Sequence, residues 1–272
     1  MCDACVIDAV KDRMLSRRHL FKGTAAVAAA ATVGTAAAPS ALSAGHGAVH
    51  DMTHELHETF PTYFGEQQFF AEQKFNYAEH KFNLFELRLS EHVGTHMDAP
   101  LHFSENGQSV AEIPTEHLMV PLCVIDIRAK AGDNADAEVT PEDVKAWIDA
   151  NGPIPEKACI AMNSGWDKHV ATDRFRNVGD DEKMHFPGFH VEAATMLIEQ
   201  SDAVGLAVDT LSLDFGMSGD FATHYAWLPT NRWGLECLAN LDSLPAKGAT
   251  LMVGAPKHRG GTGGPARVFA MV

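Results

Sequence analysis

Three histidines and one aspartate fall within eleven positions of the chain, and this segment constrains the fold more than any other. The four residues are His92, His96, Asp98 and His102. Pro100 lies among them and prevents the segment from forming one long helix. Together with Gly94, it predicts a sharp backbone course that turns the first three side chains toward one point. The fourth is expected to project from the next element.

Imidazole and carboxylate groups are ligands that suit zinc or manganese, and no cysteine lies nearby to complete a closed thiolate site. The segment therefore predicts an open, catalytic metal centre. A divalent cation in such a site lowers the pKa of a bound water toward neutrality and supplies hydroxide as a nucleophile. His102 is not required as a ligand. Because an imidazole titrates near neutral pH, this side chain is suited to proton transfer.

The N-terminus has the order of an export signal. Ser-Arg-Arg-His-Leu-Phe-Lys at residues 16–22 precedes a weakly hydrophobic, alanine-rich run from Gly23 to Ala44. This order is typical of a twin-arginine signal, and the run lacks the Leu, Ile and Val density of a membrane anchor. We therefore expect a signal peptide over residues 1–44, one catalytic domain over residues 45–272 and a periplasmic or otherwise exported location. Several small residues suit signal peptidase, so the cleavage bond stays open.

The charge balance excludes one large class of partners. The chain holds 21 basic and 36 acidic residues, a net charge of −15, and no basic stripe with interleaved aromatic residues. A nucleic-acid partner is therefore not expected. The expected partners are a small-molecule substrate and the twin-arginine export machinery, with no membrane association of the mature form.

Five cysteines are present, and their spacing does not indicate a disulfide framework. Cys2 and Cys5 would leave with the signal; their spacing fits a metal site or a redox pair, but no βαβ pattern surrounds them. Cys123, Cys159 and Cys237 remain, an odd number in apolar surroundings. They are predicted to be buried core thiols.

Strand and helix patterns alternate along the mature chain. Strands are predicted at about residues 49–54, 82–89, 122–127, 159–163, 203–208 and 266–272, and helices from residue 140 and at 191–200. Phe85, Leu87 and Leu89 alternate on one face of the second strand, which leads into the histidine segment. Thr140 and Pro141 followed by acidic residues mark a helix start. This alternation favours an α/β fold with a mixed sheet.

Four further histidines lie near the mature N-terminus, at His46, His50, His54 and His57. They fit either a second metal-binding tract or a solvated leader that enters the first strand, and nearby glycines and Pro61 favour the leader. The next segment, Phe-Pro-Thr-Tyr-Phe-Gly at residues 60–65, has the composition of a loop. Such a loop either walls an apolar pocket or packs on the core.

Two polar residues and a glycine-rich tail complete the inventory of candidate features. His224 and Glu236 lie far along the chain, and each alone is more often a structural polar group than a ligand. Residues 254–265 lack the Gly-Lys-Ser/Thr ending of a phosphate-binding loop. The tail is therefore interpreted as a turn rather than a nucleotide site.

The histidine segment, with the spacing His92-x-Gly-Thr-His96-x-Asp98-x-Pro-x-His102, resembles the signature of the cyclase family of metal-dependent hydrolases. Kynurenine formamidases and isatin hydrolases belong to this family. The resemblance extends over nearly all of the mature chain through weaker motifs. These are residues 50–54, 163–166, 187–188 and 209–214, the pair His224 and Glu236, and the terminal Gly-Pro-Ala-Arg-Val.

The resemblance implies a centre of one or two zinc or manganese ions per subunit. Its ligands would be His92, His96, Asp98, His224 and Glu236, with Asp98 bridging the two ions. His102 would donate and accept protons. Tyr63 would line the substrate pocket, at the position where formamidases of this type carry a tryptophan. The implied fold is a small, barrel-like mixed sheet with flanking helices, and the implied assembly is a homodimer or a higher homo-oligomer.

The expected activity is hydrolysis of a C–N amide bond other than a peptide bond. An aryl formamide such as N-formylkynurenine is the leading substrate, and ring opening of isatin or another cyclic amide or imide is the alternative. Export favours the alternative, because kynurenine breakdown is usually intracellular. A hypothesis of another class is an exported metal- or small-ligand-binding protein without turnover. The presence of His102 beside an intact ligand set argues against it.

Overall fold

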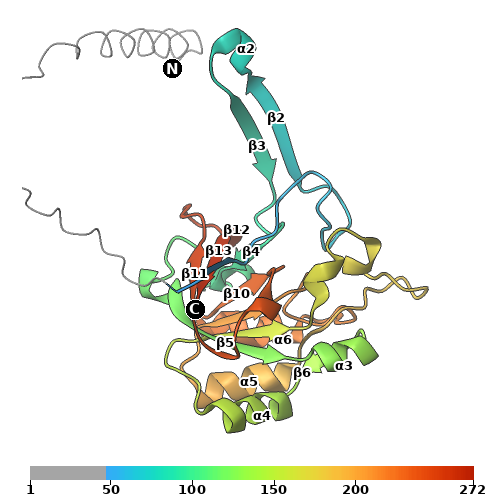
Figure 1. Ribbon diagram of the computed structural model, residues 1–272, viewed down its shortest axis with the longest axis vertical. Helices are drawn as coiled ribbons and strands as arrows, with labels where there is room; N and C mark the ends of the chain where they lie inside the picture. The colour runs from blue at the N-terminus through green and yellow to red at the C-terminus, as the bar shows by residue number, and fades with distance from the viewer. Residues whose placement is uncertain (1–46) are drawn as a thin grey trace, which may run out of the picture. The chain divides into compact units, whose positions relative to one another are not determined.

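A curled, nine-stranded mixed sheet organises residues 47–272, the part of the chain that this computed structural model describes (Figure 1). The strands lie in the order β1-β13-β11-β5-β7-β9-β10-β4-β12. Their bounds are β1 Val49–Asp51, β4 His96–Asp98, β5 Met119–Asp126, β7 Cys159–Asn163, β9 Gly205–Val208, β10 Trp233–Glu236, β11 Lys247–Gly254, β12 Gly263–Pro265 and β13 Arg267–Met271. The predicted barrel-like mixed sheet is thus confirmed. The expected signal peptide, Cys2, Cys5 and His46 lie outside the described residues.

The middle of the sheet is parallel and both flanks are antiparallel. Strands β5, β7, β9 and β10 run parallel to one another, whereas β11 beyond β5 and β4 and β12 beyond β10 continue the sheet antiparallel. Parallel neighbours need crossover connections, and helices in these connections pack on the sheet. The predicted strands at 122–127, 159–163, 203–208 and 266–272 are confirmed within a few residues at each end.

Helices cover one face of the sheet, as α4 and α5 show in Figure 1. The helix bounds are α2 Tyr77–His80, α3 Arg128–Asp133, α4 Pro141–Asn151, α5 Val191–Gln200 and α6 Ala222–Trp227. Helix α4 begins as predicted: Thr140 forms a capping box with Asp143, and Pro141 occupies the first turn. Trp147 of α4 and Leu197 of α5 lie in the core between the helices and the sheet.

The opposite face of the sheet carries a second core, in which Met97, Leu122 and Leu235 are fully or almost fully buried. The three remaining cysteines are buried and form no disulfide. Cys159 belongs to this core, Cys123 to the helix-side core and Cys237 to a smaller cluster beneath the loops. The prediction of buried core thiols is therefore confirmed.

Residues 71–87 form a separate compact unit, a β-hairpin. Its strands are β2 Phe69–Phe75 and β3 Leu84–Leu89, with α2 at the turn. Lys74 pairs with Glu72 and Glu86 on one side of the hairpin. The predicted strand at 82–89 exists, but β3 pairs only with β2, and Phe85, Leu87 and Leu89 are exposed. A two-stranded ribbon has no second layer of its own against which to bury such a face.

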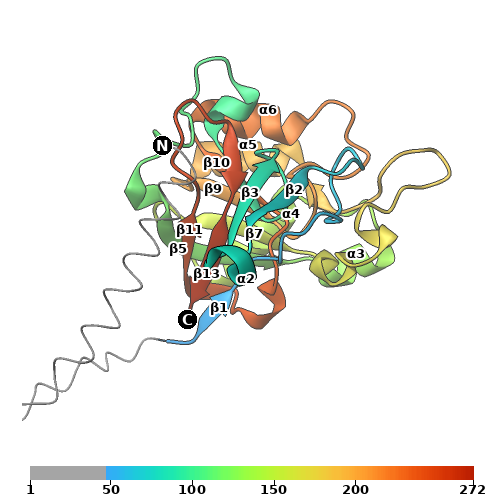
Figure 2. The same ribbon diagram turned by 90° about the horizontal axis from the view of Figure 1, so that it is seen from above.

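Short elements complete the described chain, in which Figure 2 shows the main sheet from above. A two-stranded parallel pair joins β6 Glu138–Val139 to β8 Gly188–Phe189. The 3-10 turns are η1 Pro100–Phe103, η2 Thr115–His117, η3 Trp166–His169, η4 Asp173–Phe175, η5 Leu228–Thr230 and η6 Leu241–Ser243. Turn η1 carries His102 immediately after β4, as the proline in the histidine segment predicts.

Candidate metal centre

Strand register explains how distant residues converge on the histidine segment. His96 and Asp98 are alternate residues of β4, so their side chains share one face, while Met97 between them enters the core. In the antiparallel pair of β4 with β10, Glu236 lies directly opposite His96. Directly opposed residues of such a pair have neighbouring side chains. The sheet therefore brings Glu236 to the histidine segment across 140 positions of sequence.

A glycine makes room for the aspartate on the same face. Gly234 lies opposite Asp98 in the register. A Cβ atom added at Gly234 would lie 3.1 Å from Asp98 Oδ2 and 2.9 Å from Leu213 Cδ1. Because both neighbours are packed, any larger side chain here would displace the Asp98 carboxylate.

His224 reaches the same point from helix α6, and Asp214 orients it. Asp214 Oδ2 accepts hydrogen bonds from His224 Nδ1 at 2.6 Å and from its backbone N–H at 3.1 Å. Asp214 Oδ1 accepts from the N–H of Thr223 at 2.8 Å. With Nδ1 donating to Asp214, the lone pair of His224 Nε2 faces the site.

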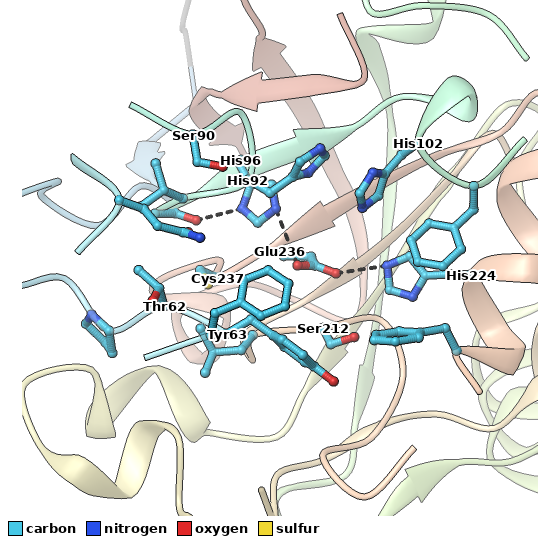
Figure 3. A pocket seen from close by; sticks show the side chains of 18 residues that line it. Thr62, Tyr63, Ser90, His92, His96, His102, Ser212, His224, Glu236 and Cys237 are labelled. Atoms are coloured by element: carbon cyan, nitrogen blue, oxygen red, sulfur yellow. Dashed lines mark hydrogen bonds and ion pairs between the residues drawn. The ribbon is translucent and has the colours of Figure 1, made fainter. Parts of the chain in front are cut away.

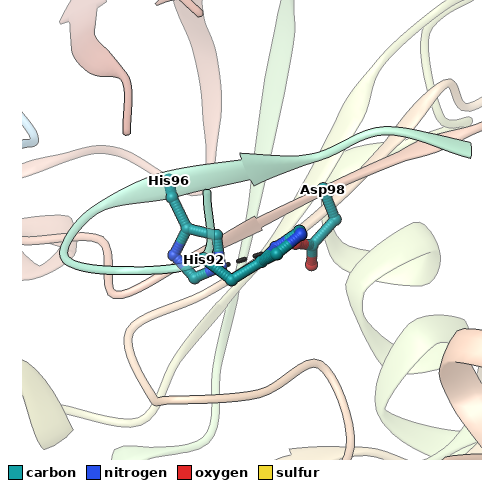
Figure 4. A group of neighbouring side chains, drawn as sticks. All are labelled: His92, His96 and Asp98. Carbon is teal, nitrogen blue, oxygen red and sulfur yellow. Dashed lines mark hydrogen bonds and ion pairs between the residues drawn. The ribbon is translucent and has the colours of Figure 1, made fainter. Parts of the chain in front are cut away.

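The donor atoms form two groups that share Asp98. His92, His96 and Asp98 make the first group (Figure 4), and Asp98, His224 and Glu236 make the second. The donor atoms within each group lie within 4.8 Å of one another. In the second group, His224 Nε2 lies 3.2 Å from Glu236 Oε1 and 3.6 Å from Asp98 Oδ2. The structure thus brings together all five residues that the sequence proposed as ligands. Among residues 47–272, His50, His54 and His57 belong to neither group.

Two buried atoms indicate that these groups fit a cation. His96 Nε2 and Asp98 Oδ2 are buried and have no hydrogen-bond partner. His96 Nδ1 lies 2.8 Å from the Gly94 carbonyl oxygen, to which it donates, so the Nε2 lone pair points toward the carboxylates. Unsatisfied buried polar atoms are costly, and a divalent cation would satisfy both. Nitrogen and oxygen donors without a thiolate match the zinc and manganese class.

In the metal-free site, the carboxylates of Asp98 and Glu236 raise the pKa values of His96 and His224. Burial acts to lower the pKa of His96, but the Asp98 and Glu236 carboxylates outweigh it and raise the pKa to about 10. Burial also opposes the protonated form of His224, yet Asp214, Asp98 and Glu236 raise its pKa well above the usual value. In the metal-free site both imidazoles therefore favour a second ring proton, held at Nε2 in place of its lone pair, and a bound cation must displace that proton.

Metal affinity should therefore rise with pH. Below the raised pKa of about 10, binding must release the proton of His96, and that of His224 as well. Each released proton strengthens the apparent affinity by about tenfold per pH unit. Calorimetric titration with Zn²⁺ at pH 6, 7 and 8, in buffers of different ionisation enthalpy, measures the apparent affinity and the number of protons released on binding. Binding without proton release at any of these pH values would contradict the assignment.

His102 lies beside the donor groups without belonging to either. Its ring stacks on His92 with centroids 3.8 Å apart and planes at 20°. Burial lowers the pKa of His102 to about 4, with His92 and His224 acting in the same direction and Asp98 opposing them. The sequence led us to expect titration near neutral pH. The difference arises because this imidazole is buried beside His92 and His224, so it is neutral at pH 7.

A cavity of about 300 Å³ opens onto the donor groups (Figure 3). Its lining is largely apolar and aromatic, and it includes four histidines and Glu236. The lining residues are Pro61, Thr62, Tyr63, Phe64, Gln68, Ser90, His92, Val93, Gly94, His96, His102, Phe103, Leu211, Ser212, Phe221, His224, Glu236 and Cys237. Residues 61–64 thus wall a pocket, while Phe60 packs in a core cluster, so each of the two interpretations of that loop holds for part of it. Tyr63 is among them, 5.8 Å from the Phe221 ring between centroids.

Sequence reasoning missed several residues at this site. Phe103 and Phe221 line the cavity, and Asp214 and Thr262 hold His224 and His92. Asp214 lies in the segment 209–214, which contributes to the family resemblance, and it precedes His224 by ten positions. Sequence spacing does not reveal the hydrogen bond between these two side chains. Thr262 lies in the glycine-rich tail. That tail is more than a turn, since β12 within it pairs with β4.

The chain is similar in sequence and structure to known proteins. The Cyclase family model, described as “Putative cyclase”, matches residues 50–215. An isatin hydrolase from Roseibium aggregatum is 33% identical over 193 residues, which is 68% of this chain and 73% of that protein. A kynurenine formamidase from Salinibacter ruber is 35% identical over 117 residues, 36% of this chain and 54% of that protein. The structure of isatin hydrolase A from Labrenzia aggregata, bound to benzyl benzoate, superposes with a TM-score of 0.79 at 37% identity, covering 85% of this chain and 96% of that one.

The match over more than half of the chain identifies it as a member of the cyclase family. Residues 14–34 match the twin-arginine translocation signal, which confirms the predicted route of export. No helix within residues 47–272 has the length and apolar character needed to cross a membrane.

Proposed function

We propose that this chain is a metal-dependent hydrolase that opens the C–N bond of a cyclic aryl amide of the isatin type. The observation that carries the proposal is the pair of donor groups that share Asp98 and border an aromatic cavity. The isatin hydrolase relatives support the substrate class, because they align with 68% and 85% of this chain. The aromatic lining provides the apolar surface that a fused-ring substrate requires.

The proposed ligands are divided between the two groups. His92, His96 and Asp98 would hold one cation, and His224 and Glu236 would join Asp98 in holding a second. Zinc and manganese both suit this donor set. A divalent cation bound here supplies positive charge that lowers the pKa of water and polarises a carbonyl oxygen.

The proton of the attacking water needs an acceptor, and His102 is placed to be one. Its ring lines the cavity and is neutral at pH 7, because burial lowers its pKa to about 4. One ring nitrogen takes the proton as water oxygen adds to the amide carbonyl carbon. The same imidazolium then delivers this proton to the amide nitrogen. The C–N bond breaks and the ring opens to a single product that carries an aryl amine and a carboxylic acid, and the acid releases its proton to solvent to become the carboxylate.

An aryl formamide is the second candidate substrate, supported by the kynurenine formamidase relative. The test is a panel of isatin, N-formylkynurenine, a cyclic imide and a lactone, each assayed with chain reconstituted with Zn²⁺ or Mn²⁺. We expect kcat/KM to be highest for isatin. A higher value for N-formylkynurenine would transfer the assignment to formamidase. Binding of these compounds without turnover of any would support the hypothesis of a binding protein.

Two replacements of Tyr63 should show whether its aromatic ring or its hydroxyl contributes to substrate binding. Tyr63 is half-buried, and burial together with Glu236 and Asp214 raises the pKa of its hydroxyl. Removing the ring in Tyr63→Ala should raise KM by about tenfold or more with little change in kcat, because uniform substrate binding is lost. Tyr63→Phe should stay within about threefold of the parent. Steady-state kinetics check both variants, and an unchanged KM in Tyr63→Ala would remove Tyr63 from the substrate pocket.

A further inference from the structure

A chain of hydrogen bonds runs from the proposed metal ligand His92 to the protein surface. His92 Nε2 lies 2.9 Å from Thr262 Oγ1. The Thr262 hydroxyl makes a short hydrogen bond with Glu91 Oε2, and the backbone N–H of Thr262 donates to the same carboxylate oxygen at 3.2 Å. Glu91 Oε1 also contacts His258 Nε2. Both Glu91 and His258 are partly exposed. This series of hydrogen bonds therefore begins in solvent and ends at the proposed metal centre.

The ionised carboxylate of Glu91 determines which atom donates in each of these hydrogen bonds. An ionised carboxylate only accepts hydrogen bonds, so the single hydrogen of the Thr262 hydroxyl goes to Glu91. Thr262 Oγ1 then has only lone pairs to offer His92, so Nε2 must carry a hydrogen. The other ring nitrogen, Nδ1, donates to Asp98 Oδ1 at 2.7 Å in the metal-free site. A cation beside Asp98 would take the place of that hydrogen, so Nδ1 is the nitrogen that it would meet.

The glycine-rich tail is shaped around this ring. Strand β12 pairs antiparallel with β4, which places Gly263 opposite Asp98. A Cβ atom at Gly263 would lie 2.8 Å from His92 Cε1 and 2.2 Å from the Met97 carbonyl oxygen. No side chain fits between β12 and the His92 ring. Gly263, the residue next to Thr262, therefore allows the tail to approach this ring closely.

We propose that Thr262 and Glu91 are positioning residues that hold His92 in the tautomer offering Nδ1 to the cation. His96 and His224 differ, because their Nδ1 atoms face the Gly94 carbonyl and Asp214, which leaves Nε2 for the cation. The inference rests on the metal centre of the proposed function. Partners of this kind typically change metal affinity by about 10–100-fold when removed.

The test measures Mn²⁺ binding rather than turnover. Full-length chain is stripped with chelator and titrated with Mn²⁺, and the free ion is followed by electron paramagnetic resonance. We expect the Kd of Thr262→Val to rise by about 10–100-fold, and that of Thr262→Ser, which keeps the hydroxyl, to stay near the parent value. Thr195→Val on α5 is the matched control, because its hydroxyl bonds only within its own helix. Glu91→Ala provides a second variant if Thr262→Val does not fold, and its Kd should rise as well.

Two outcomes separate this inference from the proposed function. A parent chain that binds no Mn²⁺ would refute the metal centre itself. A parent that binds, with folded Thr262→Val and Glu91→Ala binding equally well, would refute the positioning role and leave the centre intact. Nitrogen-15 NMR of the Zn²⁺-loaded parent gives an independent reading. A ring proton on His92 Nδ1 rather than Nε2 would overturn the inference.

Discussion

Asp98→Asn should abolish tight binding of divalent cations and lower kcat/KM by at least about a thousandfold, because the activated nucleophile depends on the cation. Asp98 is the largest single determinant of the centre, since it belongs to both donor groups and is 1% exposed. The asparagine keeps the size of the side chain but removes its negative charge. Metal content by mass spectrometry and hydrolysis of isatin measure the two effects.

The control for this variant is Asp149→Asn on the exposed surface of α4, which should retain metal and activity. Near-parental metal content in Asp98→Asn would contradict the shared ligand. Loss of one cation per chain with the other retained would show that Asp98 serves a single ion, and would remove the bridge from the account.

His102→Ala should lower kcat by about 100- to 10,000-fold, the range that a general acid–base group contributes. Metal content should not change, because His102 belongs to neither donor group. The stacking of His102 on His92 makes metal content an essential readout. If the cation is lost along with activity, the variant has disturbed the ligand rather than the proton transfer.

His57→Ala is the matched control, since His57 is an exposed histidine and belongs to neither donor group. It should behave as the parent in both assays. Full activity of His102→Ala with full metal content would exclude His102 from the chemistry. That outcome would leave the proton transfer to another group at the cavity.

The local signals in the sequence predicted the strands β1, β5, β7, β9 and β13 of the main sheet, whereas β4, β10, β11 and β12 were not predicted as strands. The Thr140 capping box and the apolar runs at 122–127 and 159–163 are examples. The hairpin was different. Phe85, Leu87 and Leu89 alternate as a half-buried strand would, but no sequence pattern tells whether a second layer exists. The domain boundary at residue 44 and the homo-oligomer stay predictions.

The residues of the site also differ in how far local sequence signals predict them. His92, His96 and Asp98 lie within seven residues, so composition and turn signals predict their convergence. Glu236 and His224 meet them only through strand register and the position of α6, and the family resemblance supplied that pairing. The pKa of His102 and the role of Thr262 depend on burial and on hydrogen-bond direction. Neither property is present in a linear sequence.

Chelation followed by reconstitution tests the central claim most directly. Purified chain is stripped of metal, assayed with isatin and N-formylkynurenine, and then titrated with Zn²⁺ or Mn²⁺ while metal content and product formation are followed together. The account predicts no hydrolysis by the stripped chain and a rise in activity that follows bound metal to saturation. Hydrolysis that is unaffected by complete metal removal, or a metal-replete chain without activity toward any amide, would contradict it.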